Sequence, residues 1–184
     1  MSPFPLDVGD GIVLRRLRVE DAEEVFAVAR ANRERLAPWM PWAGRTNSVE
    51  EQQVWLRSVS ADPDDLDGVG IFLDGRYVGG AGIHGRDPYG TGAEIGYWID
   101  GAHEGRGIVS RAVEALLTVY FDELGVHRVT IRAGAGNVRS RAVAERAGFT
   151  QEGVLREAEQ GSDGSGFHDL VVYGLLAHEW RART

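Results

Sequence analysis

The order of apolar and polar residues along the chain predicts a mixture of strands and helices. A strand is expected where apolar residues alternate or form a short run, and a helix where they recur every three to four positions. The predicted strands are 12–17, 70–73, 77–84, 93–99, 128–133, 154–160 and 167–176. The predicted helices are 20–31, 48–59, 107–124 and 137–147, and 178–183 is expected to be a tail. This order predicts one α/β domain over residues 1–184, built on a single mixed (α+β) sheet.

Turn and cap signals separate these segments. Asp74-Gly75 is a strong two-residue hairpin signal between two of the strands. Ser48, with Glu51 three positions later, forms a capping box that opens a helix. The segment 36–42 contains two prolines and two tryptophans, so we expect an irregular loop there.

One predicted strand leads through a glycine-bearing turn directly into the longest apolar helix. The strand 93–99 is followed by Gly105 and Gly107, and the helix begins at the second of these glycines. The first N–H groups of a helix have no partner within it, and they lie at the positive end of its dipole. Such a helix start binds anions, most often phosphate. The pattern therefore predicts a phosphate-bearing cofactor held by main-chain N–H groups.

A second glycine pattern, G-x-G-x-x-G over residues 80–85, resembles a dinucleotide-binding turn but lies in the wrong context. It falls within a predicted strand and precedes Asp87-Pro88 instead of a helix. We therefore interpret it as a glycine-rich strand against which another element packs closely.

Composition excludes several kinds of chemistry. The chain has no Cys, and all 20 of its basic residues are Arg, which excludes thiol nucleophiles, disulfides, Schiff bases and a P-loop lysine. The five His do not occur at metal-binding spacings, so no metal is expected. A net charge of −8 argues against nucleic acid as a partner and fits a cationic substrate such as an amine. Without a membrane-span or signal pattern, we expect no membrane partner and a cytoplasmic location.

Several blocks of residues resemble the GNAT acetyltransferase superfamily. Glu104-Gly105-Arg106-Gly107-Ile108-Val109 resembles its acetyl-CoA motif, Q/R-x-x-G-x-G/A, although Glu104 and Val109 depart from it. Asn137-Val138-Arg139-Ser140 with Glu145-Arg146-Ala147-Gly148-Phe149 resembles the N-x-x-S…K-x-G-F block of the RimJ/RimL branch. The Glu-Gly-basic-Gly form of residues 104–107 resembles the YdaF-like subgroup of that branch. The segments 32–36 with Pro38-Trp39, and 168–170 with Tyr173, are also similar to that branch.

The resemblance implies the GNAT acyl-CoA N-acyltransferase fold, with splayed central strands and flanking helices. It implies that the strand 94–99 diverges from the strand 129–133, leaving a slot for the pantetheine arm of acetyl-CoA. We expect Gly96 to form a bulge there, because glycine tolerates the dihedral angles of a bulge, and the alternative is that it only allows close packing. An N–H group near Trp98 would polarise the acetyl carbonyl. The residues expected to contact the cofactor are Trp98, Ile99, Glu104, Gly105, Arg106, Gly107, Ile108, Val109, Ser110 and Asn137.

The implied reaction is acetyl transfer to an amine by direct attack in a ternary complex, which requires a neutral amine. An α-amine with a pKa near 8 is about one-tenth neutral at pH 7, so a mild base suffices. Glu159 lies where RimL-type enzymes carry a base candidate, and Glu94 is its rival because other branches place the base on that strand. Each could equally be a surface carboxylate. Ser140 would give a proton or hydrogen bond to the departing thiolate, or it could serve only to cap its helix.

The acceptor site is expected beside the loop 36–42. Trp39 and Trp42, fixed by prolines, predict a rigid apolar wall for a peptide N-terminus or aliphatic amine, unless both indoles fill the core. His84, at a strand end, is a further candidate whose commoner role is packing.

Three functions remain open from the sequence. The resemblance favours acetylation of a protein α-amine, in particular that of a ribosomal protein. The alternatives are acetylation of a small amine, such as an antibiotic or a polyamine, and non-catalytic binding of acetyl-CoA by a sensor. The branch also allows a homodimer.

Overall fold

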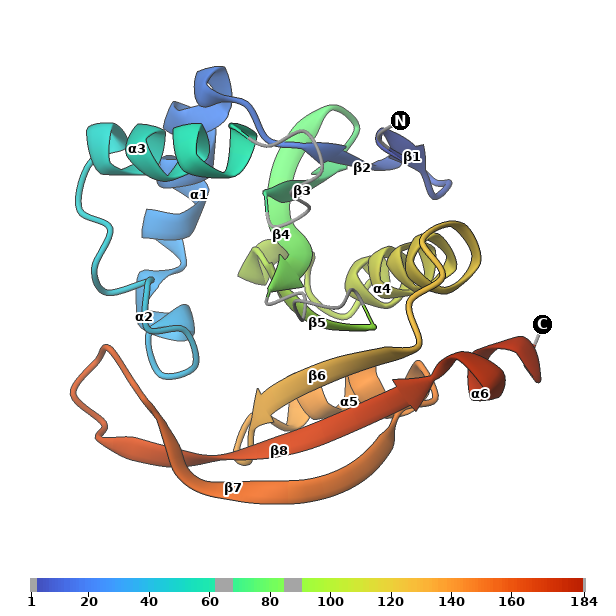
Figure 1. Ribbon diagram of the computed structural model, residues 1–184. Coiled ribbons are helices and arrows are strands. Elements are labelled where there is room, and N and C mark those ends of the chain that lie inside the picture. Colours follow the sequence, from blue (N-terminus) through green and yellow to red (C-terminus); the bar gives the residue numbers. More distant parts are fainter. Residues whose placement is uncertain (1–2, 62–67, 85–90, 184) are drawn as a thin grey trace.

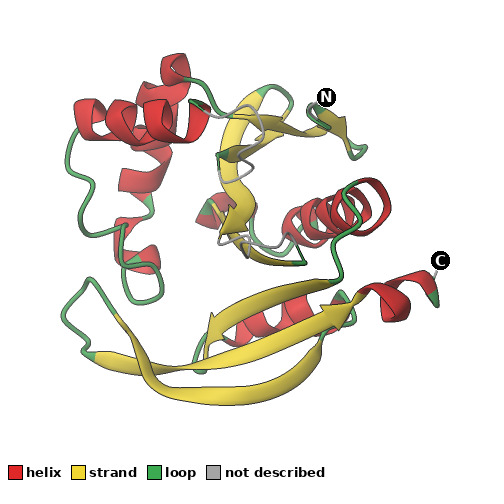
Figure 2. Cartoon of the chain, viewed as in Figure 1, coloured by secondary structure: helices red, strands yellow, loops and turns green. Residues whose placement is uncertain are grey.

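A computed structural model describes residues 3–61, 68–84 and 91–183 of the 184-residue chain. Eight strands in these residues form one mixed sheet in the order β1-β2-β3-β4-β5-β6-β8-β7, flanked by helices (Figures 1 and 2). The strands are β1 (Leu6–Asp7), β2 (Ile12–Arg16), β3 (Val69–Leu73), β4 (Arg76–His84), β5 (Gly92–Ile99), β6 (Arg128–Gly134), β7 (Thr150–Gln160) and β8 (Phe167–Leu176). The helices are α1 (Ala22–Ala31), α2 (Arg33–Leu36), α3 (Val49–Ser60), α4 (Ile108–Thr118), α5 (Val138–Arg146) and α6 (Ala177–Arg181). This arrangement confirms the predicted α/β fold with a mixed sheet.

The two halves of the sheet separate between β5 and β6, as expected. These two strands are parallel and pair at only three positions, the last of which joins Glu94 to Thr130. Beyond that point β5 continues to Ile99 and β6 to Gly134 without a pairing partner in each other. Figure 1 shows the half that contains β1 to β5 turning away from the half that contains β6, β8 and β7. The unpaired edges leave main-chain groups free to hold a ligand.

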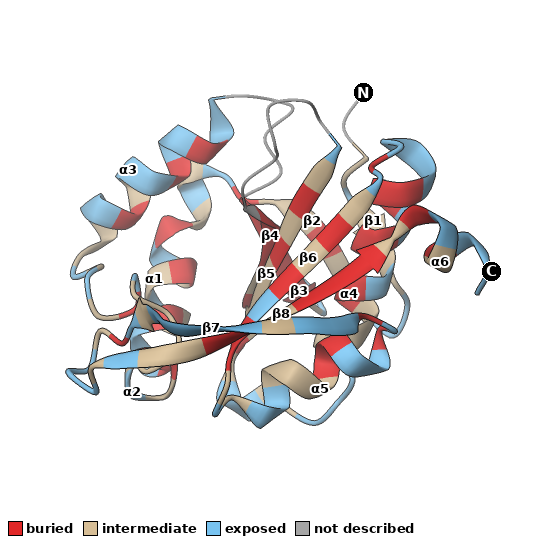
Figure 3. Cartoon of the chain, turned by 60° about the horizontal axis from the view of Figure 1, so that its bottom comes forward, coloured by how far each residue is buried: buried red, intermediate tan, exposed pale blue. Residues whose placement is uncertain are grey.

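The core lies on both faces of the central strands. Because successive residues of a strand face opposite sides, Ile71 and Val78 pack into the large cluster around α4, whereas Phe72 and Tyr77 pack with α1 and α3. Figure 3 shows burial concentrated on the central strands and exposure along β7. Four α4 side chains are fully buried, namely Ala112, Val113, Leu116 and Leu117. The prediction that this helix is well buried is confirmed.

The turn and cap signals also hold. Asp74-Gly75 joins β3 to β4, which pair directly beyond it. The Glu51 amide donates to Ser48 Oγ over 3.2 Å at the start of α3, which confirms the cap, whereas Glu51 Oε2 accepts from the Asn47 amide and not from that of Ser48, so the capping box is only half formed. Gly80, Ala81 and Gly82 lie in β4, so the second glycine pattern begins within a strand as predicted.

Two expectations were wrong. Residues 178–183 are not an extended tail, because α6 forms there and buries Trp180, whose ring stacks on Phe121 with 5.8 Å between centroids. The bulge expected at Gly96 is not formed either, since the β4–β5 ladder keeps its register from Ile99 to Glu94. The short elements β1 and α2 were not predicted. No helix in the described residues has the length and apolar character needed to span a bilayer.

Candidate active site

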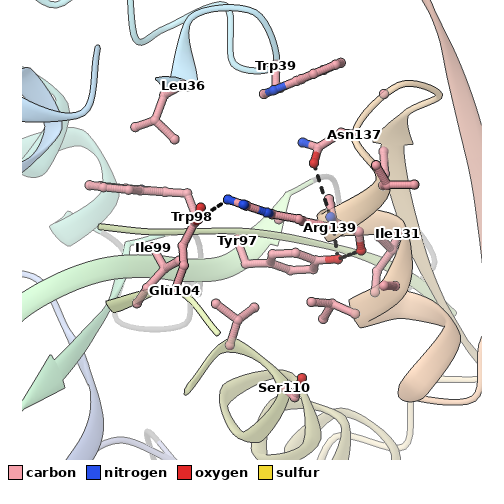
Figure 4. A pocket seen from close by; sticks show the side chains of 18 of the residues that line it. Leu36, Trp39, Tyr97, Trp98, Ile99, Glu104, Ser110, Ile131, Asn137 and Arg139 are labelled. Carbon is pink, nitrogen blue, oxygen red and sulfur yellow. Dashed lines mark hydrogen bonds and ion pairs between the residues drawn. The ribbon is translucent and has the colours of Figure 1, made fainter. Parts of the chain in front are cut away.

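The diverging ends of β5 and β6 border a pocket of about 860 Å³. Its walls come from β5, the turn into α4, β6, the start of α5, the loop after α2, and β7 (Figure 4). Among the residues expected at a site, those that line this pocket are Trp39, Trp98, Ile99, Glu104, Gly105, Arg106, Gly107, Ile108, Val109, Ser110, Asn137, Ser140 and Glu159. Segments far apart in the sequence thus meet in one cavity.

The turn before α4 has the backbone that a main-chain anion site requires. Gly105 and Gly107 both have a φ of +73°, a conformation that glycine adopts without steric cost. Gly107 is the N-cap of α4, and its carbonyl accepts the first intrahelical bond from the Arg111 amide over 3.1 Å. The N–H groups of Ile108, Val109 and Ser110 therefore have no partner within the helix. All three residues line the pocket.

A side-chain clamp holds the strand end that leads into this turn. The buried Asn32 donates to Asp100 Oδ1 over 2.8 Å and accepts from the Gly101 amide over 2.9 Å. Asp100 in turn accepts from the Ala102 amide and lies 3.0 Å from His103 Nδ1. Burial raises the pKa of Asp100, but these hydrogen bonds and the charge of His103 outweigh it and leave that pKa lower than usual.

Glu104 sits between two arginines at the pocket edge. Its Oε1 is 2.5 Å from Arg35 Nη1, and its Oε2 pairs with Arg139 on α5, so the carboxylate connects the two sides of the pocket (Figure 4). Arg35 also donates to the carbonyl of Ile99 at the end of β5. Glu104, which departs from the family motif, thus has its negative charge paired with two positive charges.

Ser140 and Tyr97 form a hydrogen-bonded pair across the slot. The Tyr97 hydroxyl donates to the Ser140 carbonyl over 2.8 Å, and Ser140 Oγ donates to that hydroxyl over 3.3 Å. Burial raises the pKa of Tyr97 to about 12, against the lowering effect of its hydrogen bond with Ser140. The phenol therefore stays protonated. Asn137 accepts from the Ser140 amide over 3.2 Å at the start of α5. The N-cap of this helix is therefore Asn137 and not Ser140.

A register shift in β7 places Glu159 at the pocket. The β7–β8 ladder is interrupted between Leu155 and Glu159, where Glu157 adopts a φ of +49°. The free amide of Glu157 donates to Asp169 Oδ1 over 2.8 Å, which holds the irregular turn of the strand. Bulges re-aim side chains, and they are frequent next to active sites. Here the outcome is that a carboxylate on an otherwise exposed strand lines the cavity.

Trp39, in the loop after α2, also lines the pocket. Its indole packs edge-on against the ring of His168 on β8, with 5.7 Å between centroids. Gly134 leaves room for it, because a Cβ there would lie 2.7 Å from Trp39 Cε3. The loop that carries Trp39 is tied to the β7–β8 turn by Ser162, whose amide donates to the Ala37 carbonyl over 2.9 Å.

Two of the predicted residues lie outside the pocket lining. Glu94 is held by Arg132, with 2.8 Å between Oε2 and Nε, and does not line the pocket. Trp42 is 38% exposed and packs against Trp98 with 5.7 Å between centroids, also outside the pocket lining. The side chain of His84 lies outside the described residues. Of the two tryptophans, only Trp39 is therefore a wall of the cavity.

The open edge of β5 presents the amides next to Trp98. The Asp100 amide donates to Val78 on β4 over 2.7 Å. Because N–H groups alternate between the two edges of a strand, the Trp98 amide also points to β4. The amides of Tyr97 and Ile99 then face the slot, in agreement with the bond from Arg35 to the Ile99 carbonyl.

Comparison with known proteins assigns the family. Residues 12–150 match the model of the acetyltransferase (GNAT) domain. The chain belongs to the GNAT acetyltransferase family. It is 38% identical to the putative ribosomal N-acetyltransferase YdaF of Bacillus subtilis (strain 168), over 96% of this chain and 97% of the relative. This GNAT enzyme has no group of three potential metal ligands within its described residues.

Solved structures of relatives resemble this acetyltransferase over nearly its full length. One is RimL, described as a ribosomal L7/L12 alpha-N-protein acetyltransferase in complex with coenzyme A, at a TM-score of 0.88 and 25% identity over 96% of this chain and 99% of RimL. Another is the microcin C7 self-immunity acetyltransferase MccE in complex with acetyl-CoA and AMP, at a TM-score of 0.85 and 27% identity over 95% and 97% of the two chains.

Sequence reasoning missed four residues that shape the pocket. Arg35 was within the segment 32–36, which is similar to the RimJ/RimL branch, and Tyr97 was within a predicted strand, but no role was assigned to either. Arg139 and His168 were within the motifs quoted above, but no role was assigned to them. Strand alternation would have placed Tyr97 on the face opposite Trp98, and only the structure shows that this face meets Ser140.

Proposed function

We propose that this GNAT enzyme transfers the acetyl group of acetyl-CoA to the N-terminal α-amine of a protein, with ribosomal proteins as the favoured class. One observation carries the proposal: a single cavity joins the main-chain anion site before α4 to the carboxylate of Glu159. The similarity to YdaF and RimL, both described as ribosomal acetyltransferases, supports the acceptor class.

The cofactor would be held mainly by backbone. The N–H groups of Ile108, Val109 and Ser110 would bind the diphosphate at the positive end of the α4 dipole, where each charge interaction contributes about 0.3–1 kcal/mol. The pantetheine arm would follow the unpaired edge of β5. An N–H group of Tyr97 or Ile99 on that edge would stabilise the negative charge that develops on the thioester oxygen.

Proton transfers would be divided between the two ends of the cavity. Glu159 would accept a proton from the α-ammonium, directly or through one water molecule. The neutral nitrogen then attacks the thioester carbon, so that a C–N bond forms and the C–S bond breaks. The second proton of the amine passes to the CoA thiolate, which leaves as the thiol. Ser140 Oγ would turn its hydrogen from the Tyr97 hydroxyl to that sulfur and donate a hydrogen bond to it as its charge develops.

A panel of acceptors tests this proposal. The purified enzyme is incubated with acetyl-CoA and peptides that begin with Ser, Ala or Met, and thiol release and peptide mass are measured. The matched controls are the same peptides with a blocked α-amine and one internal Lys. We expect acetylation of free α-amines only. Acetylation confined to lysine or to small amines would overturn the proposed acceptor, and binding without transfer would overturn the proposed reaction.

A small-molecule amine is the second candidate acceptor. It is favoured by the full-length similarity to MccE, described as a self-immunity acetyltransferase against microcin C7. Aminoglycosides and polyamines therefore belong in the same panel, each compared with the best peptide by kcat/KM.

A further inference from the structure

His168 has a buried ring nitrogen directly beside Glu159. Its Nε2 lies 3.4 Å from Glu159 Oε2. It makes no hydrogen bond within the part of the chain that the structure describes. Nearly all buried polar atoms in proteins are hydrogen bonded. Because the Nε2 of His168, without a hydrogen bond among the described residues, faces the carboxylate of Glu159, it suggests a hydrogen bond between them that forms when the pocket is filled.

Among the residues that the structure describes, the ring of His168 is held by packing contacts and not by a hydrogen bond. Trp39 packs edge-on against it with an interplanar angle of 77°. Gly134 supports this pair from β6, since a Cβ at that position would lie 2.7 Å from Trp39 Cε3 and 3.5 Å from His168 Cδ2. The imidazole is only 19% exposed, so its Nε2 is held toward Glu159 by packing.

Two consecutive residues of β8 determine where Glu159 lies, one by holding the bulge in β7 and the other by its place beside the carboxylate. Asp169 holds the bulge in β7 by accepting from the Glu157 amide. His168, one residue earlier, is the direct partner of Glu159 in the ladder beyond that bulge. The bulge brings the carboxylate to the cavity, and the imidazole lies beside one of its two oxygens.

We infer that His168 is a positioning residue for Glu159. Its Nε2–H donates to Glu159 Oε2 when the acceptor is bound, which leaves Oε1 directed at the amine. This inference rests on the proposed role of Glu159 as the base. It adds no proton to the reaction, because His168 keeps its hydrogen throughout and only fixes the orientation of the carboxylate.

Kinetics of matched variants test the inference with the best peptide of the panel and acetyl-CoA. His168→Leu removes the donor, whereas His168→Gln retains an N–H group at the distance of Nε2. We expect His168→Leu to lower kcat about tenfold with the KM for acetyl-CoA within twofold, and His168→Gln to restore most of the rate. His178→Leu, an exposed histidine of α6, is the control and should leave both constants unchanged. Thermal unfolding verifies that each variant folds.

A double-mutant cycle separates this inference from the proposed function. If His168 acts through Glu159, then His168→Leu has no further effect on kcat in a Glu159→Gln background. If Glu159→Gln lowers kcat and His168→Leu does not, the inference is wrong and the function stands. If Glu159→Gln leaves kcat unchanged, the proposed base itself is wrong.

An NMR measurement does not depend on the acceptor. A long-range ¹H–¹⁵N spectrum of the free enzyme should show a protonated Nε2 for His168, whose resonance moves in Glu159→Gln. An unprotonated Nε2 in the wild-type enzyme would overturn the inference, because that nitrogen could not donate.

Discussion

The two ends of the pocket are built in different ways. At the α4 end, residues 103–110 line the pocket as one continuous segment, and the groups that face the cavity include main-chain amides. At the β7 end, the site consists of residues from four separate segments: the side chains of Trp39, Glu159 and His168, and Gly134, which leaves room for Trp39. The first end depends on backbone conformation, which tolerates changes of side chain. The second depends on which residues meet.

This difference explains how the family motif can vary at Glu104 without loss of the site. A main-chain anion site needs its glycines and the start of its helix, and both are present. The other end has no such freedom, because each side chain there has a single position from which it reaches the cavity. Substitutions at the two ends should therefore affect different constants.

Glu159→Gln should give the largest effect and act on the rate only. Loss of a general base lowers kcat by about 100-fold or more, whereas the dissociation constant of acetyl-CoA should stay within twofold. Steady-state kinetics and calorimetric titration measure the two. Glu157→Gln, which changes a carboxylate in the same bulge outside the main pocket, is the matched control. Equal losses of kcat and of the affinity for acetyl-CoA would contradict the separation of roles between the two ends of the pocket.

Gly107→Val should act on the opposite constant. A β-branched residue at a φ of +73° is strained, and its side chain would crowd a phosphate at the start of α4. We expect the affinity for acetyl-CoA to fall by at least tenfold in a calorimetric titration. Gly75→Val has nearly the same φ, +79°, in the β3–β4 turn, so it should cost stability without a loss of affinity. Unchanged binding in Gly107→Val would refute the anion site.

Ser140→Ala should give a smaller effect, again on the rate. The hydrogen bond from Tyr97 to the Ser140 carbonyl remains, so the helix start is kept and only the hydroxyl is lost. We expect kcat to fall about tenfold, the equivalent of one hydrogen bond to a charged group. Single-turnover kinetics at saturating acetyl-CoA isolate this step. A larger loss of affinity than of rate would assign Ser140 to cofactor binding.

Glu104→Gln should give the smallest effect, and in the direction of tighter binding. It removes a negative charge beside the proposed diphosphate and frees Arg35 and Arg139 to face it. An increase in affinity of about threefold at low salt, decreasing as salt screens the charges, is expected from titration. Glu114→Gln alters the same net charge on the exposed side of α4 and should leave binding unchanged. Weaker binding in Glu104→Gln would show that the carboxylate supports the site.

Much of the fold and the α4 end could be predicted because their signals are local. The Asp74-Gly75 turn, the Ser48 cap and the glycines at 105 and 107 each act on neighbouring residues. The helix α6 was missed because it has five residues and depends on the packing of Trp180 against Phe121, which is remote in sequence.

The β7 end could be predicted only in part, for the same reason. Glu159 was identified by resemblance, but its position depends on a register shift that no residue pattern predicted. Trp39 and Trp42 looked alike in the sequence. Only tertiary contacts separate them, since one packs on His168 and the other on Trp98.

The bond network of Ser162 has a consequence for engineering new acceptor preferences. Its Oγ lies 3.1 Å from the Ala37 carbonyl and 3.2 Å from that of Met40, and it accepts from the Gly44 amide over 3.1 Å. Because these three partners are main-chain groups, a loop graft from a relative, limited to residues 37–44, would keep them only where the grafted backbone follows the same path. Chimeras should therefore exchange the loop and the β7–β8 hairpin as a cassette, since neither half is an independent module.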